Sequence, residues 1–185
     1  MRIAVIGGIG SGKSEVVKIA RDRGIFCLSA DEINSTLLKD SEYIQKIAAA
    51  FPSVVKDGAV NRRALASIVF CDEQKRKQLN RIAHPEIMKK ISECNEDPLV
   101  CELPLYIEGG DSNFDEIVLV DTCMLKRIKR LKGRGMSTKD AIARIRAQVS
   151  QKTLKEHATI IVNNNGSLDR LKKDVNALFD ELIAK

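Results

Sequence analysis

The chain reads I-A-V-I-G-G-I-G-S-G-K-S over residues 3–14. The four apolar residues at its start are typical of a strand that is buried on both faces of a parallel sheet. Residues 7–14 fit the pattern G-x-x-x-x-G-K-S/T without a mismatch, and a helical pattern follows over residues 13–21. A strand, a glycine-rich loop and a helix in this order predict a site for the phosphates of a nucleoside triphosphate.

Each part of this loop has an expected role. Glycines allow backbone N–H groups to converge on a β-phosphate, and the helix N-terminus adds its partial positive charge. We expect the Lys13 ammonium to reach the β- and γ-phosphates of ATP, and the Ser14 hydroxyl to bind Mg²⁺. The residues expected to contact the nucleotide are Gly8, Ile9, Gly10, Ser11, Gly12, Lys13, Ser14 and Glu15.

Further short apolar runs predict the rest of an α/β sheet. They occupy residues 25–28, 99–105, 117–120 and 159–162, and helical patterns separate most of them. This alternation is typical of a doubly wound fold. We therefore expect the P-loop kinase fold, with a parallel five-stranded sheet flanked by helices.

The length of 185 residues predicts a single domain with two insertions. Residues 1–32, 97–125 and 155–185 are expected to form the core, and residues 33–96 a helical insertion that shapes a substrate pocket. Residues 126–154 are strongly basic, and Gly133 and Gly135 flank Arg134. This segment is interpreted either as a mobile lid over the phosphates or as a solvated helix face.

The amino-acid composition limits the classes of molecule that the protein is expected to bind. Lys and Arg together number 31 and Asp and Glu 25, so the net charge is +6, which favours an anionic small molecule or nucleic acid. Aromatic residues make up only 4% and there is no Trp, which argues against single-stranded nucleic acid. No apolar run is long enough for a bilayer, and five cysteines without a C-x-x-C pair predict reduced thiols in the cytoplasm.

A kinase needs a carboxylate near the acceptor hydroxyl. Asp31 follows the second predicted strand, and ligands of doubly wound sheets gather at the carboxyl ends of strands. Asp31 is therefore the predicted catalytic base, and an alternative role is to cap the following helix. The guanine-reading string N-K-x-D is absent, so the chain is not expected to be a GTPase.

The ordered set of motifs resembles the dephospho-coenzyme A kinase family over almost the whole chain. The segments that carry the resemblance are G-G-I-G-S-G-K-S at 7–14, S-A-D at 29–31, D-G at 57–58 with Arg62, H-P at 84–85, L-P-L at 103–105 with Glu108, V-D at 120–121, the arginines of the basic segment with Gln148, and V-N-N-N-G at 162–166.

The resemblance implies phosphorylation of the ribose 3′-hydroxyl of dephospho-CoA by ATP and Mg²⁺. It implies that Asp31 is the base and that Arg144 binds the nucleotide. The catalytic arginine is Arg130 or Arg134, because the family spacing does not carry over cleanly. Substrate contacts are implied for Asp31, Arg62, His84, Pro104 and Leu105, with a helix-boundary role as the alternative for His84.

The chain departs from the family pattern at Ser29, Ser35 and Thr159, where Asp, Arg and Asp are usual. Glu102 is expected either to orient a water on Mg²⁺ or to be an ordinary strand residue. The alternatives for function are another P-loop kinase, or a nucleotide-binding module without phosphotransfer. We expect a cytoplasmic monomer or small homo-oligomer that binds neither nucleic acid nor membrane.

Overall fold

The structure, a computed structural model, describes residues 1–103 and 114–184. The chain divides into two units, one formed by Met1–Ser29 with Asn95–Lys185 and the other by Ala30–Cys94. Each unit has its own packing and is described by itself.

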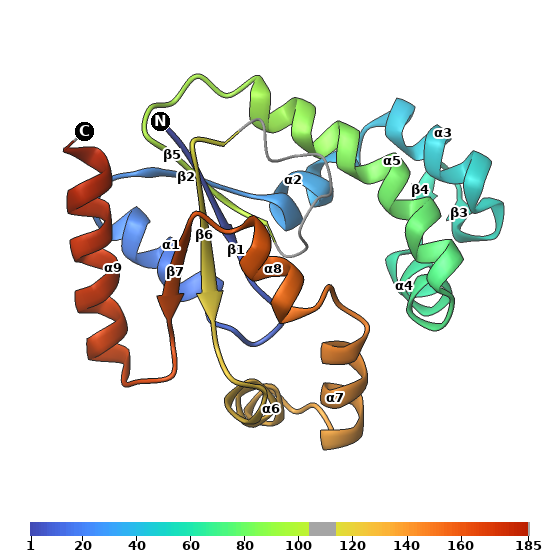
Figure 1. The fold of residues 1–185 in the computed structure, drawn as a ribbon. Coiled ribbons are helices and arrows are strands. Elements are labelled where there is room, and N and C mark those ends of the chain that lie inside the picture. Colours follow the sequence, from blue (N-terminus) through green and yellow to red (C-terminus); the bar gives the residue numbers. More distant parts are fainter. Residues whose placement is uncertain (104–113, 185) are drawn as a thin grey trace. The chain divides into compact units, whose positions relative to one another are not determined.

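A five-stranded parallel sheet organises the first unit (Figure 1). Its spatial order is β2-β5-β1-β6-β7, and every neighbouring pair is parallel. The strands are β1 (Arg2–Ile6), β2 (Phe26–Ser29), β5 (Leu99–Glu102), β6 (Glu116–Asp121) and β7 (Ile160–Asn163). The predicted α/β fold with five parallel strands is therefore confirmed. Strand β1 lies at the centre of the sheet, and its residues Ile3, Ala4, Val5 and Ile6 are all buried, as expected for a central strand.

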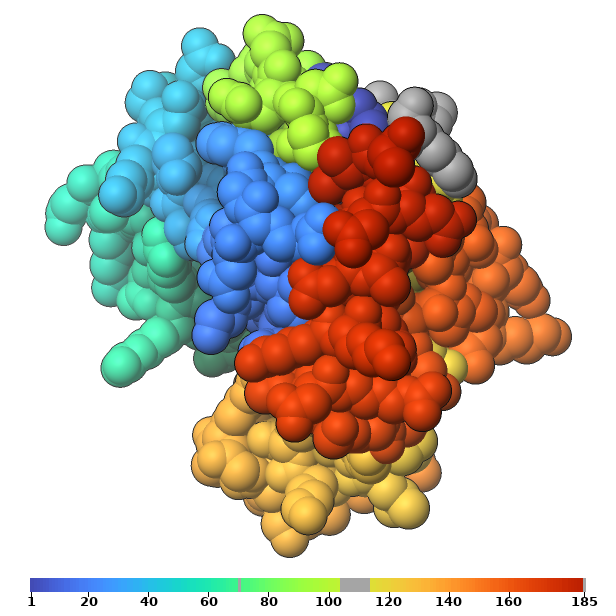
Figure 2. Space-filling view, turned by 90° about the vertical axis from the view of Figure 1, so that its left-hand side faces the viewer, coloured from blue at the N-terminus to red at the C-terminus, as the bar shows by residue number. Residues whose placement is uncertain are grey.

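Helices α1 (Lys13–Asp22) and α9 (Leu168–Ile183) contact each other and cover the core of this unit. Figure 2 shows α1 in blue beside α9 in red. Val16 and Val17 of α1 join Val175 and Phe179 of α9 in one buried cluster with the sheet. The apolar stripe of each helix thus decides which side packs on the strands.

The basic segment forms three short helices in the first unit. They are α6 (Met124–Gly133), α7 (Thr138–Arg146) and α8 (Gln151–His157). The hydroxyls of Ser137 and Ser150 accept hydrogen bonds from the first turns of α7 and α8, which is why the chain restarts as helix at these points.

The second unit is mainly helical, as expected from its sequence. Its elements are α2 (Ala30–Leu37), α3 (Ser41–Ala50), η1 (Pro52–Val54), β3 (Val55–Lys56), β4 (Ala59–Val60), α4 (Arg62–Cys71) and α5 (Glu73–Ser92). The predicted turn at Asp57 and Gly58 joins the two short strands, and both residues have positive φ. None of the helices in the described ranges combines the length and the apolar character that a membrane crossing requires.

Candidate active site

The loop between β1 and α1 leaves little room for a side chain at Gly7, Gly8 or Gly12. A Cβ atom on Gly8 would lie 2.1 Å from Nη2 of Arg127, and one on Gly12 would lie 2.2 Å from Nδ2 of Asn164. Gly12 also has φ of 102°, in the left-handed region. Glycine is required here because α6 and the segment after β7 lie directly against the loop.

Lys13, the first residue of α1, lies against this loop. Its side chain is buried, and its Nζ donates a hydrogen bond to the Gly7 carbonyl oxygen at 2.7 Å. The ammonium charge therefore lies at the start of the loop and at the N-terminus of a helix. Both features favour an anion.

Ser14 is paired with an acidic residue from another strand. Its hydroxyl donates to Oε1 of Glu102 at 3.0 Å, and Glu102 ends β5 in register with Ser29 and Val5. Both are oxygen donors at the carboxyl end of the sheet. This set fits Mg²⁺, which takes one or two protein oxygens and completes its coordination with phosphates and water.

Arg127 and Gln148 hydrogen-bond to the backbone of Ile9 in the loop. The Arg127 Nε donates to the Ile9 carbonyl at 2.8 Å, and the Arg127 Nη2 donates to Oε1 of Gln148 at 3.2 Å. The same Gln148 oxygen accepts from the Ile9 N–H at 2.7 Å. Burial lowers the pKa of Arg127, and the charge of Asp121 opposes this effect, but a guanidinium remains protonated.

The structure separates the two arginines that the sequence left as alternatives. Arg130 donates to the carbonyls of Gly10 and Ser11 at 3.2 and 2.8 Å, and also to Asn164. Arg134 lies at the C-terminal end of α6 and is exposed. Arg144 lies in the last turn of α7. Of the two alternatives, Arg130 is the one that hydrogen-bonds to the phosphate loop, as Arg127 also does.

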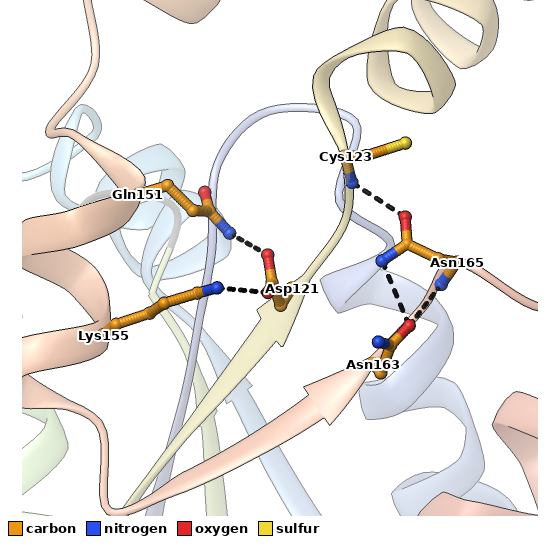
Figure 3. A network of polar contacts seen from close by, with 6 residues as sticks. All are labelled: Asp121, Cys123, Gln151, Lys155, Asn163 and Asn165. Atoms are coloured by element: carbon orange, nitrogen blue, oxygen red, sulfur yellow. Dashed lines mark hydrogen bonds and ion pairs between the residues drawn. The ribbon is translucent and has the colours of Figure 1, made fainter.

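Asparagines and a carboxylate organise the chain beside the loop (Figure 3). Asp121, the last residue of β6, accepts from Gln151 at 2.5 Å and pairs with Lys155 at 2.7 Å, both on α8. The Cys123 N–H donates to Asn165 at 2.8 Å, and Asn165 in turn donates to Asn163. These contacts tie α8 to the end of β6 and join the segments that follow β6 and β7.

The predicted substrate residues Asp31, Arg62 and His84 belong to the second unit. Helix α2 begins at Ala30, so Asp31 lies exposed inside its first turn and is not the N-cap. Arg62 donates to the Ser35 carbonyl at 3.2 Å and ties α4 to α2. His84 lies in the middle of α5, which continues through Pro85, so a helix-boundary role for it is wrong.

The remaining predicted substrate residues, Pro104 and Leu105, lie outside the described residues, as does Glu108. Within residues 1–103 and 114–184 no cluster of three or more His, Cys, Asp or Glu side chains could hold a metal ion.

Two side-chain contacts with the loop were not predicted from the sequence. Thr122, which is buried, donates to the Ser11 carbonyl, and Gln148 was noted only as part of a motif. A hydroxyl directly after a strand is too common a feature to indicate a loop contact. In addition, its partner Ser11 is 111 positions away in sequence, so no local pattern joins the two residues.

Comparison with known proteins identifies the family. The family model for dephospho-CoA kinase matches residues 1–170. The dephospho-CoA kinase of Deinococcus radiodurans is 32% identical over 190 residues, covering 98% of this chain and 92% of its own length. That of Bacillus licheniformis is 34% identical over 190 residues, covering 96% and 94%.

Solved structures agree with this assignment. A crystal structure from Thermus thermophilus superposes with a TM-score of 0.77 at 31% identity, covering 98% of this chain and 97% of that one. The dephospho-CoA kinase of Campylobacter jejuni gives a TM-score of 0.69 at 25% identity, covering 98% of each chain. Shikimate kinase from Acinetobacter baumannii, at 13% identity and a TM-score of 0.61, shares the fold. The chain belongs to the dephospho-CoA kinase family.

Proposed function

We propose that this chain transfers the γ-phosphoryl group of ATP to the ribose 3′-hydroxyl of dephospho-CoA, giving CoA and ADP. The observation that carries the proposal is the glycine loop at the start of α1 with the buried Lys13 ammonium lying on it, in a member of this family. This arrangement suits the charge of a triphosphate.

The loop and its lysine bind the phosphates and stabilise the negative charge that the leaving ADP gains. Lys13 donates to the Gly7 carbonyl in the structure, and a phosphate oxygen would be a stronger, charge-assisted acceptor for the same ammonium. Its charge therefore contributes both to binding and to the transition state.

Ser14 and Glu102 are the residues that would hold Mg²⁺, since their oxygens already lie 3.0 Å apart. When bound, the ion supplies positive charge to the β- and γ-phosphate oxygens. Ser14 would supply its hydroxyl oxygen as a ligand, and Glu102 would accept hydrogen bonds from water bound to the ion.

Asp31 accepts the proton of the 3′-hydroxyl as that oxygen forms its bond to the γ-phosphorus and the bond to ADP breaks. Arg134, exposed between two glycines, supplies charge to the transferring phosphoryl, and Arg144 binds the nucleotide phosphates. Arg62, His84, Pro104 and Leu105 are the further residues expected to contact the substrate. The free cysteines are consistent with the reducing cytoplasm. Both substrates, ATP and dephospho-CoA, are small molecules.

The test is to incubate the protein with MgATP and a panel of acceptors, namely dephospho-CoA, adenosine, shikimate and gluconate, and to identify products by mass. We expect phosphorylation of dephospho-CoA alone. The Lys13→Ala variant is the matched control, and it should lose turnover by about 10²-fold or more with its fold intact.

Phosphorylation of a different acceptor would replace the proposal with another kinase activity. Binding of MgATP without any phosphorylated product would instead indicate a nucleotide-binding module. Near-normal turnover of Lys13→Ala would contradict the assignment of the phosphate loop.

A further inference from the structure

The carbonyl oxygen of Ser11 accepts three hydrogen bonds from side chains outside the loop. The Thr122 hydroxyl donates at 2.8 Å, Nη1 of Arg130 at 2.8 Å and Nδ2 of Asn164 at 2.7 Å. A carbonyl has two lone pairs, so three donors of this quality saturate it.

The three donors come from separate parts of the first unit. Thr122 follows the last residue of β6, Asn164 follows the last residue of β7, and Arg130 lies on α6. The side chains of Thr122 and Asn164 are 2% and 5% exposed. Arg130 also donates to Oδ1 of Asn164 at 3.1 Å, which orients the amide with its nitrogen toward Ser11.

Such an anchor controls the direction of the next amide. The peptide bond between Ser11 and Gly12 is planar and trans, so its C=O and N–H point in opposite directions. With the carbonyl held against the three donors, the Gly12 N–H points away from them. Among the residues that the structure describes, no group accepts a hydrogen bond from it.

We propose that Thr122, Asn164 and Arg130 are positioning residues that aim the Gly12 N–H at a nucleotide phosphate. The proposal rests on the proposed function, in that ATP is the ligand of this loop. Turning the peptide over would leave the buried donors of Thr122 and Asn164 and the partly buried Arg130 without this acceptor, so the free protein already holds the binding orientation. Arg130 thereby acts by positioning the loop. Stabilisation of the charge on the transferring phosphoryl group is then the role of another arginine.

A positioning role and a merely structural role predict changes in different quantities, namely nucleotide affinity and the temperature of unfolding. An amide aimed in advance strengthens phosphate binding in the ground state and in the transition state alike. Its loss therefore raises the Kd for MgADP and the KM for ATP and leaves kcat nearly unchanged. A structural role would lower the temperature of unfolding without altering nucleotide affinity.

The experiment compares Thr122→Val, which removes the hydroxyl at nearly constant volume, with Thr122→Ser, which keeps it. Titration calorimetry with MgADP should show a Kd about fivefold higher for Thr122→Val, the equivalent of one net hydrogen bond. Thr122→Ser should restore the wild-type affinity.

Thr159→Val is the matched control. The Thr159 hydroxyl accepts from the Ile117 N–H at 2.8 Å and precedes β7, whereas Thr122 follows a strand end at the loop. Its loss should affect stability and leave the Kd for MgADP unchanged. A Thr122→Val protein that binds MgADP as tightly as the wild type would overturn the proposal, while wild-type turnover of dephospho-CoA tests the proposed function separately.

A second measurement applies even if Thr122→Val is too unstable for calorimetry. The NMR amide resonance of Gly12 in the free protein should shift in Asn164→Ala, because the carbonyl of the same peptide loses a donor. It should stay in place in Thr159→Val. An unmoved Gly12 resonance in Asn164→Ala would contradict the anchor.

Discussion

The Gln148 side-chain oxygen accepts a hydrogen bond from the backbone N–H of Ile9 at 2.7 Å, across 139 positions of sequence. Arg127 donates both to this oxygen and to the Ile9 carbonyl. One residue of the phosphate loop is thus held at both of its polar groups by side chains of the basic segment. This segment is therefore part of the site and more than a solvated helix face.

Replacing Gln148 by Ala should raise the KM for ATP by about fivefold, because the Ile9 N–H and an Arg127 nitrogen lose their shared acceptor. Steady-state kinetics measure the effect. Gln151→Ala is the control, since Gln151 bonds Asp121 and makes no contact with the loop among the described residues. Equal effects of the two substitutions would show that Gln148 acts only on local stability.

Replacing Asp31 by Asn keeps the size of the side chain but removes a proton acceptor. Since general-base catalysis typically contributes 10²–10⁴-fold, turnover should fall by about that range while the Kd for MgADP stays constant. Glu32→Gln, on the neighbouring residue of α2, should leave turnover near the wild-type value. A wild-type rate for Asp31→Asn would remove Asp31 from the mechanism.

The basic segment offers a comparison among arginines. Arg134→Ala should lower kcat more than it changes the KM for ATP, because an arginine that acts in the transition state adds little to ground-state binding. Arg127→Ala should mainly lower stability, since Arg127 is 6% exposed and bonded to the loop. Arg134→Ala should also cost more in turnover than Arg127→Ala.

Arg130→Ala and Arg144→Ala complete the series, and the former should raise the KM for ATP. If all four variants kept turnover near the wild-type value, the lid interpretation of residues 126–154 would be wrong.

Tyr43 should ionise at unusually high pH. Burial, with a smaller contribution from Glu86, raises its pKa to about 12, and its hydroxyl donates to Oδ1 of Asn34 at 2.9 Å. An unfolded tyrosine ionises near pH ~10. The native state therefore keeps its proton longer, and the stability that Tyr43 contributes is complete below pH ~10 and is lost as pH rises to about 12.

Absorbance titration of tyrosinate checks this value, since the chain has two tyrosines and no Trp. The step at high pH should disappear in Tyr43→Phe. A wild-type titration with both tyrosines ionising near the ordinary value would contradict the burial of this hydroxyl.

The sequence by itself determined the strand, loop and helix of residues 3–21, the other core strands and the helical character of the insertion predicted over residues 33–96. These features depend on neighbours within a few positions, namely apolar periodicity and a glycine pattern, and such local preferences can be read without the fold. Even here some boundaries were wrong. Helix α2 begins at Ala30, before the predicted residue 33, and β5 ends at Glu102, before the predicted residue 105.

Only the tertiary structure decided which side chains support the loop. Thr122, Arg130 and Asn164 meet Ser11 from 111, 119 and 153 positions away. Their meeting depends on the strand order, which puts β6 beside β1 and β7 beside β6, so that the segments after these strands reach the same edge of the sheet. The order of the strands in the sheet cannot be predicted from the spacing of residues along the chain. Arg130 lies within α6 and contacts the loop, whereas Arg134 follows Gly133, the last residue of that helix, and is exposed, so their different surroundings follow from where α6 ends.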